Sequence, residues 1–500
     1  MRLLRIWLVL AGASLAVLAQ TNAPEIRKLS LEDCIQNALR KNLDLQIARY
    51  IPPLALSDLQ ASYGGYNPNF SIGGAHNYSM TAGGFNPQLG TLTAGTTSDA
   101  NSFNGSLGGL TPWGLNYSLA GNINEFYGTA GPDQTPFDQS RGLAGITLTQ
   151  PLLKNFWIDQ TRLNIRIAKN RVKYSELTLK QQIMQTATTV ENAYYDLIYD
   201  REYVTVQQKA LELAMQLVVE NRKRVEVGAL APLDQQQAEA QAASFDAALI
   251  AAKSALAIQE HLVKQLITDE YSRWANLSIE PSGTLTSPRH FFNLQDSWSK
   301  GLTQRPDLLQ AKLDIERQGV TIKYTHNQLF PELDLVGTYG HNAAGFSEFS
   351  SSFGQIRDGS FPYYSYGAQL TFPIGNTSAR AAYKSSKLVL EQLVLSLKKL
   401  EQMIMVQIDN DIKQAESSFQ QVAATRTARE YAAAALDAEQ KKLESGKSTT
   451  YTALQMQRDL TTARGNEIQA LDNYNKALSQ LSLDEGTTLQ RLGINIEVVK

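Results

Sequence analysis

The sequence predicts an α+β protein of two similar halves, each with the order helix, strands, very long helix, glycine turn and shorter helix. Two observations carry this prediction. The first is a pair of proline-free segments, from Lys154 to Val227 and from Thr377 to Ser445, which are far longer than the helices of ordinary globular domains. The second is that short motifs recur in the same order along the chain, which indicates an internal duplication.

The N-terminus has the pattern of a secretory signal peptide over residues 1–19. Arg2 and Arg5 precede an apolar run from Ile6 to Leu18, and the small residue Ala19 follows. Such a run is too short to span a membrane as a helix, and we expect cleavage near Ala19. Since no later run reaches about 18 apolar residues, we expect that any membrane-spanning part is a closed barrel of strands.

Pairs of similar motifs align the two halves. The helix openings "ALRKNLDL" and "GLTQRPDL" place Asp44 over Asp307, and the same offset places Pro68 over Pro331. We assign the first repeat to residues 29–284 and the second to residues 285–490. Their strand regions cover residues 68–151 and 331–373, and their helical hairpins cover residues 154–270 and 377–485.

Proline marks each junction between strand and helix. Pro68 and Pro331 precede stretches in which apolar and polar residues alternate, the pattern of a strand with two different faces. Pro151 and Pro373 end the returning strands "ITLTQP" and "QLTFP". A proline at such a place has no ladder hydrogen bond to lose and suits the first turn of a helix, so we expect helices to begin or end there.

The shorter helices are about half as long as the long ones. They cover about Leu29 to Tyr63, Pro232 to Ile267, Asn293 to Gln328 and Thr449 to Leu483. Two of them end to end match one long helix, which predicts a rod-like antiparallel coiled-coil wall with the strands at one end. The Gly228 and Gly446 turns would lie at the other end. The Pro52-Pro53 pair should kink or break the first helix.

The first strand region is much longer than the second, and its extra part is rich in Gly, Asn, Ser and Thr. One interpretation is two additional strands, around Phe103 to Leu110 and Leu115 to Ile123, joined by a tight turn at Pro112-Trp113-Gly114. The other interpretation is a single long polar surface loop. The sequence leaves both open, and with them the number of strands.

Composition and motifs argue against several classes of function. Charged residues make up 19% of the chain and the net charge is -2, so no basic field exists to hold a nucleic acid. The histidines lack metal-ligand spacing, and Cys34 is the only cysteine. The Gly-Lys-Ser in "ESGKSTT" lacks the earlier glycine of a phosphate-binding loop, and we interpret it as a turn with Gly446 in the left-handed conformation. We expect no enzymatic activity, no cofactor and no metal.

The motifs "NLDLQIA", "RPDLLQA", "QPLL", "FPI" and "VGALAPLDQQQAEAQ" resemble those of TolC-like outer-membrane efflux channels, and the resemblance runs from about Leu29 to Leu489. It implies a homotrimer whose strands form one shared transmembrane β-barrel, continued by a long α-helical coiled-coil tunnel through the periplasm. Family members usually have two strands per half, so the insertion departs from the pattern. The implied partners are a periplasmic adaptor protein, an inner-membrane transporter and the lipid of the outer membrane.

The function that we expect is a passive exit duct of a tripartite export system, either multidrug efflux or type I secretion, energised by the inner-membrane partner. The alternative is a structural or adhesive coiled-coil protein of the cell envelope. The resemblance also implies which residues act. The tips that would contact an adaptor carry Val227, Gly228, Ala229, Leu230, Gly446 and Lys447, and the positions of the periplasmic entrance carry Asp234, Thr452 and Gln455.

Family members often narrow the entrance with aspartates after the second turn, where this chain has Thr452 and Gln455 instead. In the family, the counterpart of Asp234 can pair with an arginine near the second turn. The nearby candidates in this chain are Lys447 and Ser448, so the tie is a lysine contact or is missing. We therefore expect a polar, weakly charged entrance.

Overall fold

The computed structural model describes residues 25–88, 90–130, 134–346 and 349–494. The predicted signal peptide at residues 1–19 lies outside the described residues. The chain forms two compact units. A helical unit takes in the residues up to Gln46, Gln185–Phe291 and Asp411–Leu483, and a sheet unit takes in Ile47–Met184, Phe292–Asn410 and the residues from Asp484 onward. Each unit contains segments from both predicted repeats, so the repeats and the compact units divide the chain differently.

Two very long helices supply residues to both units. They are α4, Gln160–Glu226, with 67 residues, and α10, Thr377–Glu444, with 68 residues. Helix α10 begins where the sequence predicts. Helix α4 begins later than the predicted Lys154, because Leu152 still donates a backbone hydrogen bond to Leu333 of the sheet, 2.7 Å long. Residues 153–159 then connect the sheet to the first turn of α4.

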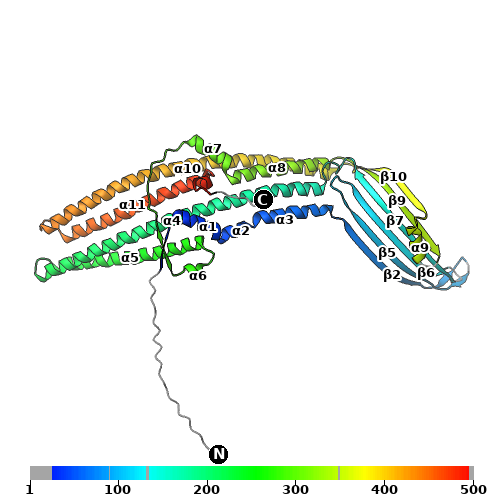
Figure 1. Cartoon of the computed structure of the whole chain (residues 1–500), viewed down its shortest axis with the longest axis horizontal. Coiled ribbons are helices and arrows are strands. Elements are labelled where there is room, and N and C mark those ends of the chain that lie inside the picture. Colours follow the sequence, from blue (N-terminus) through cyan, green and yellow to red (C-terminus); the bar gives the residue numbers. More distant parts are fainter. Residues whose placement is uncertain (1–24, 89, 131–133, 347–348, 495–500) are drawn as a thin grey trace, which may run out of the picture. The chain divides into compact units, whose positions relative to one another are not determined.

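In the helical unit, α5 (Pro232–Ile267) and α11 (Thr450–Asp484) pack along the ends of the long helices, as Figure 1 shows. The packing surfaces consist mostly of small residues, which let the helices approach closely. One cluster joins Ala210, Ala214 and Val218 of α4 to Ala238, Ala242 and Phe245 of α5 and to Leu454 of α11. A second joins Val422 of α10 to Ala470 and Tyr474 of α11.

A small two-stranded parallel sheet in the helical unit was not expected from the sequence. It pairs β1 (Glu25–Leu29) with β8 (Leu277–Pro281), which lies just after the short helix α6 (Tyr271–Trp274). The buried Tyr194 of α4 holds this sheet, since its hydroxyl donates to the carbonyl of Leu29 at 3.2 Å and accepts from the backbone N–H of Gly283 at 3.1 Å. Two short strands that lie so far apart in the sequence have no local pattern from which their pairing could be predicted.

The helices predicted at Leu29 to Tyr63 and Asn293 to Gln328 are each broken at a position that was not predicted from the sequence, which corrects the predicted ranges. The segments are α1 (Leu31–Lys41), α2 (Leu43–Ala48) and α3 (Ile51–Ser62) in the first half, and α7 (Leu294–Gln304) and α8 (Pro306–Asn327) in the second. Asn42 and Arg305 form equivalent breaks with nearly equal extended backbone angles. The extra break before α3 confirms the effect predicted for Pro52-Pro53, which occupy the first turn of that helix.

Among the described residues, six strands form one antiparallel sheet in the order β10-β9-β7-β6-β5-β2 (Figure 1). Their bounds are β2 Asn69–Thr81, β5 Thr96–Leu110, β6 Asn116–Ala130, β7 Thr135–Pro151, β9 Glu332–Phe346 and β10 Pro362–Thr371. A separate two-stranded hairpin consists of β3 (Gly84–Asn86) and β4 (Thr91–Thr93). The first half thus supplies four strands of the large sheet.

The interpretation of the insertion as two extra strands is confirmed, and the surface-loop alternative is wrong. Strands β5 and β6 are longer than the predicted segments, and they meet at the predicted turn, where Gly114 has a φ of +92° and donates to the carbonyl of Thr111 at 2.9 Å. A stretch so rich in Gly, Ser and Asn forms strands because it has partner strands on both sides.

The two faces of the large sheet carry different side chains near the start of β2. Paired positions across all six strands place Phe70, Leu107, Leu119, Ile146, Tyr339 and Tyr364 in one exposed apolar row. The adjacent row on the other face contains Asn69, Gly108, Ser118, Thr147, Thr338 and Ser365. The short helix α9 (Phe349–Arg357) packs on the face of the apolar row, farther along the strands, where Ser352 is hydrogen-bonded to Ser140 and Ile356 lies next to Gly142. Ser140 belongs to a polar row on this same face, together with His76, Asn101 and Glu125. Within the described residues, no helix is both long and apolar enough to cross a membrane.

Candidate functional site

The tips of the two helical hairpins have the same backbone structure. Gly228 and Gly446 follow α4 and α10 with φ angles of +74° and +72°. In both turns the residue after the glycine donates a backbone hydrogen bond to the carbonyl five residues earlier, from Ala229 to Arg224 at 2.7 Å and from Lys447 to Lys442 at 2.8 Å. This is the Schellman arrangement that ends many helices, and it confirms the left-handed conformation predicted for Gly446.

The tip residues are open to a partner. Val227 is 78% exposed, Gly228, Ala229, Gly446 and Lys447 are also exposed, and Leu230 is half-buried. Leu233, in the first turn of α5, is 62% exposed and adds another apolar side chain to the first tip. A solvent-exposed apolar tip between polar helices is a typical feature of a protein contact surface.

The two tips differ in side-chain chemistry. At the second tip, the Ser448 hydroxyl donates to Glu439, whose other oxygen lies 3.0 Å from the Lys442 ammonium. The Ser448 hydrogen bond, followed by the Lys442 contacts, holds the pKa of the Glu439 carboxyl below its usual value. At the first tip, α5 begins with Pro232 in its first turn and has no side-chain cap. The exposed side chains of the first tip, such as Val227 and Leu233, are apolar, whereas those of the second tip are polar or charged.

Of the three predicted entrance residues, Asp234 lies in the first turn of α5, and Thr452 and Gln455 lie in the first two turns of α11. Asp234, Thr452 and Gln455 are all half-buried. The backbone carbonyl of Asp234 accepts from Asn221 at 3.3 Å, and the Thr452 hydroxyl lies 2.9 Å from that of Thr449. Within the described residues of one chain, no ion pair joins Asp234 to Lys447. The closing tie that the sequence left open is thus missing inside one chain.

The four prolines lie at the ends of strands, and none of them is inside a helix. Pro68 and Pro331 come directly before β2 and β9, Pro151 is the last residue of β7, and Pro373 follows β10. The expectation that they suit the first turn of a helix is wrong, because α4 and α10 begin only at Gln160 and Thr377. What the four prolines share is a position at or next to the end of a paired strand.

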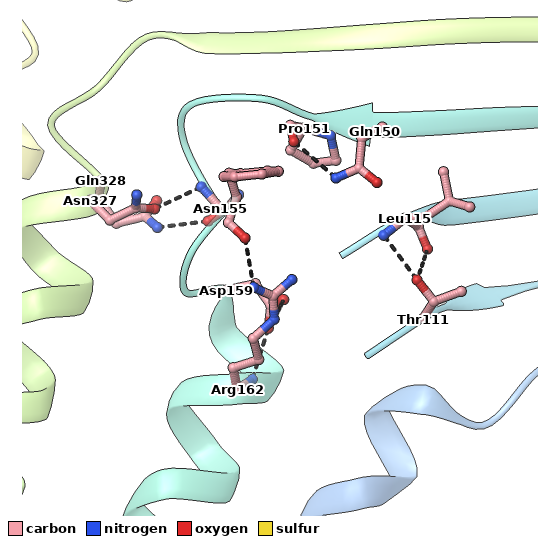
Figure 2. A network of polar contacts seen from close by, with 10 residues as sticks. Thr111, Leu115, Gln150, Pro151, Asn155, Asp159, Arg162, Asn327 and Gln328 are labelled. Carbon is pink, nitrogen blue, oxygen red and sulfur yellow. Dashed lines mark hydrogen bonds and ion pairs between the residues drawn. The ribbon is translucent and has the colours of Figure 1, made fainter. Parts of the chain in front are cut away.

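A polar network fixes the connection between β7 and α4 (Figure 2). Asn155, with a φ of +65°, accepts from Gln328 at 2.7 Å through its side chain, and its backbone N–H donates to Asn327 at 2.7 Å. One oxygen of Asp159 then caps α4 by accepting from the backbone N–H of Arg162 at 2.8 Å, and the other lies 3.0 Å from the guanidinium of Arg162. The network holds the end of α8 against the start of α4.

Sequence reasoning missed these network residues. Asp159 had a readable signal, because an aspartate directly before a helical pattern is a common N-cap. The contacts of Asn155 had no signal in the sequence, because its partners Asn327 and Gln328 lie far away along the chain. No group of three or more His, Cys, Asp or Glu side chains in the described part of the chain is arranged to hold a metal ion.

Comparison with known proteins identifies the family. The model of the outer membrane efflux protein family matches residues 18–268 and 298–484, which is most of the chain. The protein belongs to the outer membrane efflux protein family. It is similar to the outer membrane efflux protein BepC of Brucella suis biovar 1 (strain 1330), with 25% identity over 370 residues, 72% of this chain and 76% of BepC.

Two solved structures show the same fold. The CmeC outer membrane channel of Campylobacter jejuni matches with a TM-score of 0.66 at 16% identity, covering 92% of this chain and 86% of CmeC. The outer membrane protein VceC of Vibrio cholerae matches with a TM-score of 0.65 at 17% identity, covering 91% of this chain and 96% of VceC. Channels of this fold are trimers.

Membership in the outer membrane efflux protein family assigns the function and the location. The protein is an efflux channel of the outer membrane that extends into the periplasm, and its family consists of channels, not enzymes. The alternative of a structural or adhesive coiled-coil protein is therefore rejected.

We expect Gly228→Ala and Gly446→Ala to destabilise the tips by about 1–2 kcal/mol each, because a Cβ is unfavourable at a left-handed φ. Backbone hydrogen–deuterium exchange at the ends of α4 and α10 should become about 5- to 30-fold faster. Gly319→Ala in α8 is the matched control, because no atom lies within 4 Å of its added Cβ and alanine favours a helix. Unchanged exchange at the substituted tips would contradict the role assigned to these glycines.

Proposed function

We propose that three copies of this chain form a passive exit duct within a tripartite export system. The observation that carries the trimer is the pair of open edges of the large sheet. Within the described residues, β2 and β10 each have a neighbour on one side only, whereas β5, β6, β7 and β9 are paired on both sides. Unpaired backbone groups are costly in a membrane, so these edges require partner strands.

The directions of the edge strands support pairing between copies. All five neighbouring pairs in the sheet are antiparallel, so β2 and β10 run in opposite directions. The β2 strand of one copy can therefore add to the β10 strand of the next as another antiparallel pair. Repeating this pairing around a threefold axis closes the shared barrel, with the apolar row from Phe70 to Tyr364 toward lipid.

The hairpin tips support an adaptor as the second partner. Val227, Ala229 and Leu230 offer apolar contacts at one tip, and Gly446 and Lys447 offer a polar surface at the other. An inner-membrane transporter that drives either multidrug efflux or type I secretion completes the system. This chain would then supply the passage, because its sequence contains no recognisable nucleotide-binding motif to couple an energy source.

Planar-bilayer recording of the purified protein, combined with chemical crosslinking in membranes, tests the duct. We expect discrete conductance steps and crosslinked species up to the trimer. Conductance from a species that remains monomeric after crosslinking would refute the shared barrel, and a trimer without conductance would refute the duct.

We expect Ala229→Glu and Leu230→Glu each to abolish export while leaving the trimer intact, because a charge would be desolvated in an apolar adaptor contact. Export by a strain that depends on this channel measures the effect. Ala251→Glu, at an exposed position of α5 away from the tip, is the matched control and should export normally. Normal export by both tip variants would remove the tips from the adaptor interface.

We expect the conductance to be insensitive to millimolar divalent cations added on the periplasmic side. The entrance positions carry Thr452 and Gln455, so a threefold axis would not create a dense carboxylate ring from them. Conductance recorded with and without magnesium measures this. Strong block that is relieved by replacing a carboxylate other than Asp234 would show that the entrance lies elsewhere.

A further inference from the structure

We infer that the inserted hairpin β5–β6 is part of the barrel wall, so that the trimer closes with 18 strands and a wider lumen than a 12-stranded member of the family. This inference rests on the proposed shared barrel. It would be wrong if the hairpin folded into the lumen as a plug or lay outside the barrel, and three sets of contacts argue against both arrangements.

The first argument is the pairing of the hairpin. Strand β5 is paired along its length with both β2 and β6, and β6 with both β5 and β7. The two inserted strands are therefore central strands of the sheet. A plug or an outer flap would leave β2 paired directly with β7, and these two strands do not pair.

The second argument is that apolar and polar side chains of the inserted strands lie on the same faces of the sheet as those of the neighbouring strands. Leu107 of β5 and Leu119 of β6 lie in register with Ile146 of β7, in the apolar row that runs from Phe70 to Tyr364. On the opposite face, Ser118 pairs with Thr147. A strand lining a lumen on both faces would have no reason to keep this alternation, whereas a wall strand between lipid and water requires it.

The third argument is the position of the hairpin turn. Gly114 is buried at the strand–helix junction, where a Cβ would collide with the guanidinium of Arg162 at the start of α4. The turn is closed by the Thr111 hydroxyl, which donates to the carbonyl of Leu115 at 3.1 Å and accepts from the backbone N–H of Leu115 at 3.0 Å (Figure 2). The hairpin thus ends at the same level as β7, next to the residues that connect β7 to α4.

Three copies of the six described strands give 18 strands, against 12 for copies with two strands per half. Because the diameter of a barrel grows roughly linearly with strand number, the wall would be about 1.5 times as wide. A barrel of 16 to 18 strands encloses an aqueous channel. The passage through the membrane would then be wide, and the selection of cargo would fall to the periplasmic entrance.

Site-directed spin labelling of the full chain in lipid vesicles tests the wall position. Leu107→Cys and Leu119→Cys report on the apolar row and Ser118→Cys on the polar row, with Ile146→Cys and Thr147→Cys of β7 as matched controls. Cys34 can stay, because it is fully buried and burial raises the pKa of its thiol to about 12. We expect labels at Leu107, Leu119 and Ile146 to respond to oxygen, and labels at Ser118 and Thr147 to respond to a water-soluble nickel complex.

Labels at Leu107 and Leu119 that respond to the nickel complex, while the Ile146 label responds to oxygen, would overturn the inference and leave the duct intact. Failure of the unlabelled protein to form trimeric channels in the same vesicles would instead refute the proposed function. Cryo-electron microscopy then measures the barrel, which we expect to be about 1.5 times as wide as that of a variant lacking residues 96–130. Equal widths would also overturn the inference.

Discussion

Backbone hydrogen bonding is the constraint on which the sheet and its junctions depend. In hydrocarbon, an unpaired N–H or C=O group costs several kcal/mol, so strand pairing must be complete wherever lipid is the solvent. The four prolines, which have no N–H to donate, lie just outside the paired stretches or at their last residue, so they remove no hydrogen bond from within the sheet. Beyond them, the side chains of Asn327 and Asp159 accept hydrogen bonds from backbone N–H groups that neither strand nor helix satisfies, those of Asn155 and Arg162.

The two hairpin tips share a backbone conformation but differ in the side chains that a partner protein would contact. Both turns require a glycine at a left-handed φ, and both make the same pair of backbone hydrogen bonds. The side chains around the glycines are free of that requirement, and they have diverged into an apolar tip near Val227 and a polar tip near Ser448. A trimer would therefore present six tips of two alternating kinds, which gives an adaptor two distinct contacts per copy.

Much of this fold is predictable from the sequence, because its main elements are signalled locally. Long segments without proline or glycine predict α4 and α10, and alternation predicts the strands. The start of α4 was misplaced because it depends on contacts of residues 152–159 with Pro331 and Asn327, which are distant in sequence. The break at Arg305 could have been predicted, since the following Pro306 disfavours a helical conformation of the residue before it. The entrance positions are assigned only by resemblance and stay a prediction, because no local pattern distinguishes them.

The insertion also shows how such a barrel can change size without changing its closure. Closure by β2 and β10 requires that the two edge strands run in opposite directions, which holds only when each copy contributes an even number of strands. One additional strand would make the edges parallel and displace the start of α4 to the other side of the membrane. A hairpin adds two strands and returns the chain to the same level, where Gly114 packs against Arg162. Growth by hairpins therefore leaves the helices, and the tips that they carry, unaltered.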